Sequence, residues 1–338
     1  MMNVYFTVDT ESSIGGAWSN PDRRPLKADK HIFCRVGNHD YGIGFITHTL
    51  SEYGFRATYF VETLMTLVNG EDDVKRVFEF LVEHNQDVQL HIHPTYRFYA
   101  ESLRARALQQ QYLPPPKNDL LSNFDEERQM DFIGQAAAFY ERFVGRRPVA
   151  FRAGCFAANE VTLRCLRRAG LVLDTSFNPC YSEWSFPDGK LKPNHVCRVE
   201  GVWEIPVTVA RTPLPEGYGG LKHADPCALS FAELRMMLER GVELGQKHFV
   251  IVFHSFSAVK AKDATYDEIK PDRVTINRLQ RLMAYLSDRS DLYRVSTFGD
   301  LAGEIDTLET AETPVAALAF LTAGLRKSVQ GLNRCYWF

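Results

Sequence analysis

Acidic and histidine residues occur in closely spaced pairs in this 338-residue chain, next to apolar runs. Asp9 and Glu11 follow the run 4–8, and His91 and His93 lie at the end of a later run. Residues i and i+2 of an extended segment point to the same face, so each pair can converge on one point. Two histidines and a carboxylate suit a catalytic divalent ion, which makes a bound water more acidic. Such a site performs hydrolysis, in which one carboxylate binds the metal and the other takes the proton of the water.

Two other apolar runs also end on a chemically capable residue. The run 149–152 ends on Arg152, and the run 249–254 ends on His254. In parallel α/β folds the active site collects at the carboxyl ends of the strands, so these runs can deliver their last residues to one place. A single strand histidine is usually a hydrogen-bonded core or rim residue, but two at i and i+2 would both need partners on one face. The pattern therefore predicts an enzyme built around one metal ion.

Apolar runs of strand length alternate with segments of helical periodicity, an order that predicts parallel βαβ units. We expect strands at 4–9, 56–61, 87–92, 149–152, 171–175, 203–209, 249–254 and 292–296. We expect helices at 42–53, 72–84, 125–143, 159–169, 230–244 and 271–286. A chain of this size with 45% hydrophobic residues can form one catalytic domain, which we expect over 1–305. Glycine, proline or charge interrupts the alternation in insertions near 12–40, 96–124 and 177–228.

Composition excludes some classes of partner and compartment. The formal net charge of -3 gives no basic field to attract a phosphate backbone, so nucleic acid is not an expected partner. The seven cysteines are odd in number and show no C-x-x-C spacing, which favours reduced thiols. No charged and apolar leader precedes the first strand, so we expect a cytoplasmic protein.

The segment 306–338 differs from the rest of the chain. Residues 315–325 are rich in alanine and leucine, and Arg326, Lys327 and Arg334 follow them. The apolar part is too short to span a bilayer. Two interpretations stay open for contacts through 314–338. The helix either lies peripherally on the inner face of a membrane, or it packs on the domain or on a second copy of the chain.

The residues around the paired acids and histidines resemble the polysaccharide deacetylases with a NodB-homology domain, also called carbohydrate esterase family 4, over about residues 3–300. The first family motif, T-F-D-D-G, is similar to Thr7-Val8-Asp9-Thr10-Glu11. Its leading Asp is the base, which implies that role for Asp9, while Thr10 replaces the usual metal ligand. Relatives with a D-x-E arrangement place the ligand one residue later, which implies Glu11 as the ligand, with Asp9 as the alternative.

The other family motifs have counterparts in the same order. His91-Ile92-His93-Pro94 resembles the H-x-H-P motif of the WalW-type branch and implies that both histidines bind metal. The family resemblance also implies that Arg152 pairs with the base and orients it, and that His254 is the general acid. The resemblance further implies that Asp174 orients this acid, and the alternative is that Asp174 caps a turn.

The resemblance implies a distorted (β/α)7-type barrel and a deacetylase that uses one divalent metal ion, expected to be Zn²⁺. The expected substrate is an acylated amino sugar, an intermediate of surface polysaccharide biosynthesis. Two alternatives stay open, a metal-dependent hydrolase of a non-sugar C–N bond such as an imide or small amide, and a catalytically silent carbohydrate-binding or assembly protein. The residues expected to contact sugar, each with a packing role as its alternative, are Trp18, His39, Tyr41, Trp184 and Trp203.

Overall fold

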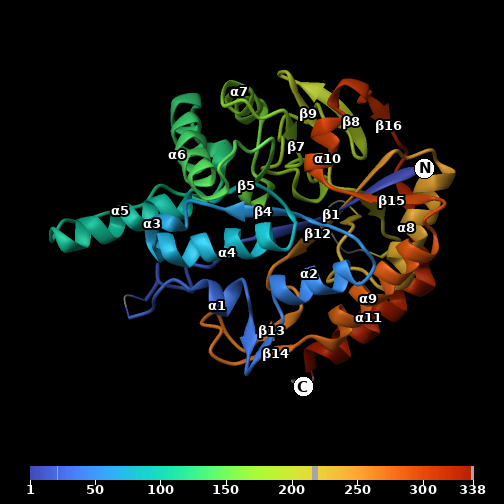
Figure 1. The fold of residues 1–338 in the computed structure, drawn as a ribbon, viewed down its shortest axis with the longest axis horizontal. Coiled ribbons are helices and arrows are strands. Elements are labelled where there is room, and N and C mark those ends of the chain that lie inside the picture. Colours follow the sequence, from blue (N-terminus) through green and yellow to red (C-terminus); the bar gives the residue numbers. More distant parts are fainter. Residues whose placement is uncertain (21, 215–219, 336–338) are drawn as a thin grey trace.

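A curled, mostly parallel sheet forms the centre of the computed structural model (Figure 1), which describes residues 1–20, 22–214 and 220–335. Neighbouring strands run parallel across most of the sheet, and only the last two pairings at one edge are antiparallel. This arrangement confirms the predicted α/β class and its distorted barrel. In order across the sheet, the strands are β12 (His248–His254), β1 (Met2–Thr10), β4 (Thr58–Glu62), β5 (Asp87–Ile92), β6 (Ala150–Ala153), β7 (Leu173–Asp174), β9 (Val202–Glu204), β8 (His195–Val199) and β16 (Ala311–Glu312).

The strand β15 (Tyr293–Ser296) pairs with the first half of β1, and β4 pairs with its second half. The longer helices begin and end within two residues of the predicted ranges, and several of them carry side-chain caps at their N-termini. Asp125 accepts a hydrogen bond from the N–H of Arg128, and Ser230 forms a capping box with Glu233. The helices are α2 (Ile43–Ser51), α3 (Thr66–Asn69), α4 (Glu71–Glu83), α6 (Glu126–Val144), α7 (Glu160–Arg168), α8 (Phe231–Glu243), α9 (Arg273–Asp288) and α10 (Phe298–Gly303).

The alternation along β1 explains how the sheet divides apolar from reactive side chains. Val4, Phe6 and Val8 belong to the main core cluster, whereas Tyr5 belongs to a second cluster. Because side chains alternate between faces, Asp9 lies on the same face as Tyr5 and opposite to the main core. The odd positions of β1 therefore lead along one face to the strand end where the acidic residues stand.

Part of the predicted insertion 96–124 contributes to the core. Its first half is the helix α5 (Thr95–Ala107), which projects from the body in Figure 1. Phe98 of this helix is buried, and its ring packs against Phe124 and Phe132 at centroid distances of 5.5 and 5.7 Å. The charges of this segment predicted an insertion outside the core. In the structure, aromatic contacts anchor the start of α5 to the core.

The other predicted insertions contain short helices and strands. The segment 12–40 contains the helix α1 (Ala28–His31) and a hairpin, and most of the remaining strands lie in the second half of the chain. The short strands are β2 (Arg35–Val36), β3 (His39–Asp40), β10 (Val209–Arg211), β11 (Leu221–His223), β13 (Val259–Ala261), β14 (Ile269–Pro271) and β17 (Ala316–Ala317).

The segment after 305 is joined to the rest of the fold. β16 pairs with β8, β17 pairs with β10, and the helix α11 (Phe320–Cys335) packs against α8 (Figure 1). Residues 336–338, which belong to the predicted tail, lie outside the described residues. Within the described ranges, every helix falls short of the length and apolarity needed to cross a membrane.

Candidate active site

Asp9 and Arg152 form a buried ion pair at the carboxyl end of the sheet. Nη1 of Arg152 lies 2.6 Å from Oδ1 of Asp9, and Nη2 donates to the hydroxyl of Thr7 at 2.8 Å. The Nε–H of Arg152 donates to the carbonyl of Thr175 at 3.3 Å, and its guanidinium lies over the ring of Phe60. These three hydrogen bonds fix the guanidinium of Arg152, and the one to Oδ1 in turn orients the Asp9 carboxylate.

His254 approaches the other oxygen of Asp9. The two residues are register partners in β12 and β1, and Nε2 of His254 lies 3.9 Å from Oδ2 of Asp9. This distance is longer than a hydrogen bond, so the two groups are separate. Since Oδ1 of Asp9 is held by Arg152, Oδ2 is the oxygen that faces the imidazole.

Glu11, His91 and His93 bring three metal-ligating atoms within 4.8 Å of one another. Nε2 of His91 lies 3.6 Å from Oε2 of Glu11, and Nε2 of His93 contacts the same oxygen. The backbone carbonyl of Glu11 accepts a hydrogen bond from Nδ1 of His31 at 2.9 Å, which helps to fix the chain there. Among the described residues Glu11, and not Asp9, completes this three-residue cluster. We call Glu11, His91 and His93 the ligand cluster.

The second ring nitrogen of each histidine is held by another group. Nδ1 of His91 donates to the carbonyl of Arg152 at 2.7 Å, and Nδ1 of His93 donates to Oδ2 of Asp119 at 2.9 Å. These hydrogen bonds leave Nε2 of both rings directed to Glu11, which is the arrangement that metal-binding histidines need. Asp119 was missed by the sequence analysis because it lies in the loop after the 114–116 proline block.

The electrostatics of the ligand cluster favour a bound positive charge. Burial raises the pKa of Glu11, but the imidazoles of His93 and His91 bring that pKa well below its usual range. Burial lowers the pKa of His93, but Asp119 and Glu11 outweigh burial and raise it well above the usual value. The cluster thus stabilises a proton between carboxylates, and a divalent cation can replace that proton. Two imidazoles and one carboxylate fit a catalytic metal with an open coordination position.

Gly154 lets the turn after β6 approach the ligand cluster. A Cβ atom at this position would lie 2.6 Å from three ring atoms of His93. The next two residues, Cys155 and Phe156, have φ angles of 54° and 58°, so the chain turns sharply here. Only glycine leaves room for the His93 ring in this conformation.

We expect Gly154→Ala to weaken metal binding by roughly 10- to 100-fold, because the methyl group displaces the ring of His93 from Glu11. Competition with a zinc-sensitive dye measures the affinity, and circular dichroism checks the fold. The matched control is Gly134→Ala in α6, where an added Cβ meets nothing within 4 Å. Equal metal affinity in the two variants would show that the added methyl group does not displace the His93 ring from Glu11.

Glu62 is a second residue that the sequence analysis missed. Its buried carboxyl, at the end of β4, accepts hydrogen bonds from the N–H groups of Leu64, Met65 and His93. Burial raises the pKa of this carboxyl to about 8, although the imidazole of His93 and the three N–H groups lower it. By accepting a hydrogen bond from the N–H of His93, Glu62 helps to fix the position of this residue in the ligand cluster.

Asp174 lies in a buried carboxyl pair with Glu204, its register partner on β9. The Ser176 hydroxyl donates to Oδ1 of Asp174 at 2.7 Å, and the N–H of Phe177 donates to Oε1 of Glu204 at 3.0 Å. Oδ2 of Asp174 and Oε2 of Glu204 have no donor from any other described group. The two carboxyls lie within hydrogen-bonding reach, so one shared proton satisfies both atoms. The orienting role of Asp174 toward His254 stays a prediction.

The carboxyl pair should make stability depend on pH. Burial and the neighbouring Asp174 raise the pKa of Glu204 well above its usual value of 4.5. The folded state therefore keeps a proton that the unfolded chain releases, and the free energy of unfolding falls as pH rises above 4.5. Glu204→Gln replaces the shared O–H by an amide N–H, so we expect urea unfolding to show a flatter pH dependence. The control is Glu83→Gln, at an exposed position at the end of α4, and an unchanged slope in Glu204→Gln would contradict the shared proton.

The five aromatic and histidine residues expected to contact sugar have different surroundings. Trp184 donates its indole N–H to the carbonyl of Cys155 at 2.7 Å, next to the turn that contacts His93. Trp18 donates to the hydroxyl of Thr95 at 3.1 Å, two residues after His93. Trp203 packs against the second core cluster. His39 lies on β3, in the hairpin that β3 forms with β2, and Tyr41 follows this hairpin.

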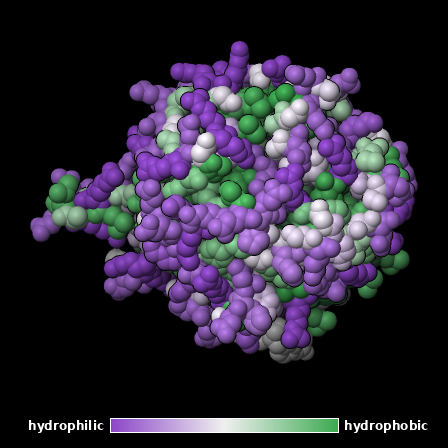
Figure 2. All heavy atoms as spheres, in the orientation of Figure 1, coloured by the Kyte–Doolittle hydropathy of each residue, from purple (hydrophilic) through white to green (hydrophobic). Residues whose placement is uncertain are grey.

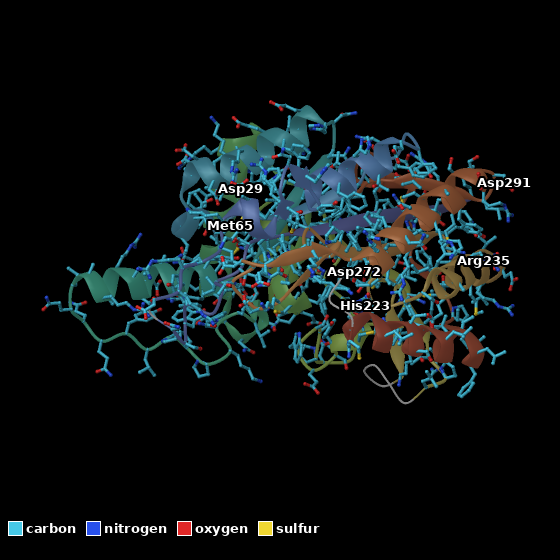
Figure 3. The ribbon with its side chains drawn as sticks, turned by 90° about the horizontal axis from the view of Figure 1, so that it is seen from below. Asp29, Met65, His223, Arg235, Asp272 and Asp291 are labelled. Atoms are coloured by element: carbon cyan, nitrogen blue, oxygen red, sulfur yellow. The ribbon has the colours of Figure 1, made fainter. Side chains whose placement is uncertain are left out.

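A cavity of about 570 Å³ opens beside His254. Asp225 and Tyr266 line it, and the far wall includes residues of α11. Burial raises the pKa of the Asp225 carboxyl, but the imidazole of His223, whose Nε2 lies 3.7 Å from Oδ2 of Asp225, outweighs burial and keeps that pKa below its usual range, and His254 adds to this effect. Figure 3 labels His223 near the centre of the molecule, above α11 (red). A substrate at Asp9 and His254 has room to extend in this direction.

Comparisons with known proteins support the fold. No protein-family model matches the sequence, and no curated protein matches it. The structure of a proposed polysaccharide deacetylase from Mycobacterium smegmatis is similar, with a TM-score of 0.53, 13% identity, and coverage of 94% of this chain and 95% of the other. A proposed glycoside hydrolase/deacetylase from Parabacteroides distasonis gives a TM-score of 0.58 at 12% identity, covering 91% of this chain and 72% of the other. At such identities the likeness shows a shared fold.

Proposed function

We propose that this chain is a metal-dependent deacetylase that removes the N-acetyl group, or another acyl group, from an amino sugar. One observation carries the proposal: the ligand cluster lies beside an Arg152-held Asp9 and His254, and these residues come together from the carboxyl ends of β1, β5, β6 and β12. The fold shared with structures described as deacetylases supports the same reaction. We place the protein in the polysaccharide deacetylase family, on its H-x-H-P branch, and its substrate among cytoplasmic intermediates of surface polysaccharide assembly.

Glu11, His91 and His93 would hold one divalent ion, expected to be Zn²⁺, which supplies Lewis acidity for the acyl carbonyl and the attacking water. Asp9 acts as the general base through Oδ2, since Arg152 occupies Oδ1 and compensates the buried charge. His254 donates a proton to the departing amine. The separation of 3.9 Å between Nε2 of His254 and Oδ2 of Asp9 lets the two groups act on different atoms of the substrate.

We expect one metal ion per chain in the purified protein after zinc is supplied. His91→Ala and His93→Ala should each lose it, because either change removes one of three donors. Elemental analysis with parallel measurement of acetate release from acetylated amino sugars tests the proposal. The control is His84→Ala, an exposed histidine after α4 whose Nδ1 donates only to the carbonyl of Phe80.

Three other outcomes would each revise the proposal differently. Full metal occupancy in His91→Ala and His93→Ala would refute the ligand cluster. Bound metal with no acetate release, but with hydrolysis of an imide or a small amide, would move the function to a non-sugar C–N bond. Absence of metal in the wild type after zinc is supplied would favour a catalytically silent carbohydrate-binding or assembly protein.

A further inference from the structure

The helix α11 packs on the protein through its polar side chains. The Arg326 guanidinium is buried, and its Nε lies 3.0 Å from Oε2 of Glu233 in α8. The side-chain amide of Gln330 donates to the carbonyl of Cys227 at 3.1 Å. Asn333 donates to Oδ1 of Asp272 at 3.1 Å, and Figure 3 shows Asp272 near this red helix. The inner face of α11 is thus held by hydrogen bonds and one buried ion pair.

The outer face of α11 is apolar. Leu321, Leu325 and Leu332 are 78%, 68% and 60% exposed, and Phe320 and Val329 are also exposed. Positions 321, 325, 329 and 332 lie on one stripe of an α-helix. Hydrophobic side chains appear at the lower right edge of Figure 2, where Figure 1 places α11. Because α11 turns its polar groups inward and its leucines outward, it leaves an apolar surface that a membrane or another protein can cover.

The surroundings of this stripe are basic. A groove of about 450 Å³ runs between α11 and the neighbouring helices, and Arg273 and Arg281 line it together with Leu325 and Val329. Among the described residues that line this groove, none is acidic. The sequence of α11 itself contains no Asp or Glu. Apolar and cationic groups therefore share the surface.

We propose that the α11 stripe docks this protein on an anionic lipid surface. Leucines on one side of a helix and arginines beside them are the pattern of helices that lie in a membrane interface. Anionic headgroups neutralise Arg273 and Arg281 while the leucines enter the acyl boundary. A second copy suits the surface less well, because a two-fold contact sets each patch against itself and brings like charges together.

This docking would also orient the candidate active site. The inner face of α11 supplies Gln330, Asn333 and Arg334 to the cavity that begins at His254. The same helix therefore has the cavity on one side and the apolar stripe on the other. Docking through α11 does not depend on the reaction that the site catalyses.

Cosedimentation of the full chain with vesicles tests the proposal. We expect binding to vesicles of equal parts phosphatidylglycerol and phosphatidylcholine, and weaker binding at high salt or to pure phosphatidylcholine. The double variant Leu321→Glu/Leu325→Glu should lower the partition coefficient at least about tenfold, since it places charges in the acyl boundary. The matched control is Leu108→Glu/Leu113→Glu, two exposed leucines beyond the end of α5.

A second variant separates charge from apolar contact. Arg273→Gln/Arg281→Gln should weaken binding to the anionic vesicles and remove its salt dependence in part. Thermal unfolding midpoints of all variants check that they fold. Equal vesicle binding by wild type and Leu321→Glu/Leu325→Glu would overturn the proposal, as would absence of binding by the wild type. A wild-type dimer in sedimentation velocity that this variant converts to a monomer would assign the stripe to a second copy.

Discussion

His254→Ala is expected to lower the turnover number for acetate release by roughly 10²- to 10⁴-fold while the metal stays bound. His254 lies outside the ligand cluster, at the end of β12, and its imidazole is partly exposed beside Oδ2 of Asp9. Its loss removes the proton donor for the leaving amine but leaves all three metal-ligating residues in place. Steady-state kinetics and elemental analysis of the same preparation measure the two effects.

The leaving group gives this prediction a sharper form. A substrate whose departing amine is weakly basic needs less protonation, so an acetanilide with an electron-withdrawing ring should lose less rate in His254→Ala than an acetylated amino sugar. His84→Ala again serves as the control for replacing a histidine. An equal loss for both substrates would assign His254 a role in binding, and an unaffected rate would dismiss it as the general acid.

Much of the fold and the two histidines of the ligand cluster could be predicted from local patterns, whereas the choice of Glu11 over Asp9 rested on the family resemblance. Strand positions come from apolar runs, and a polar residue that ends such a run must stand at the carboxyl edge of a parallel sheet. Glu62 and Glu204 end β4 and β9 in the same way. They were missed because the predicted strand 56–61 stopped one residue early and because 203–209 was read as a single run.

Asp119 and the orientation of α11 had no comparable local signal. Asp119 reaches His93 only because the long loop after α5 folds back over the sheet, and that path depends on tertiary contacts. For α11, an apolar helix normally turns its leucines toward the protein. Here the buried pair of Arg326 with Glu233 fixes the opposite orientation, and a charge pair between distant segments cannot be read from periodicity.

Arg152→Met is expected to lower the free energy of unfolding by roughly 3–5 kcal/mol, because it leaves the Asp9 carboxylate buried without its partner. The side chain of Arg152 is completely buried, and Asp9, Thr7 and Thr175 accept its hydrogen bonds. Urea unfolding monitored by circular dichroism measures the change.

A double-mutant cycle separates the ion pair from lost packing against Phe60. Asp9→Asn removes the charge that Arg152→Met strands, so the double variant should be more stable than Arg152→Met alone even though both variants are inactive. If the two changes instead add without coupling, the cost of Arg152→Met comes from packing, and the guanidinium does not hold the base by charge. The stability cycle therefore tests the proposed orientation of Asp9 without an activity assay, because coupling between the two side chains is what that orientation requires.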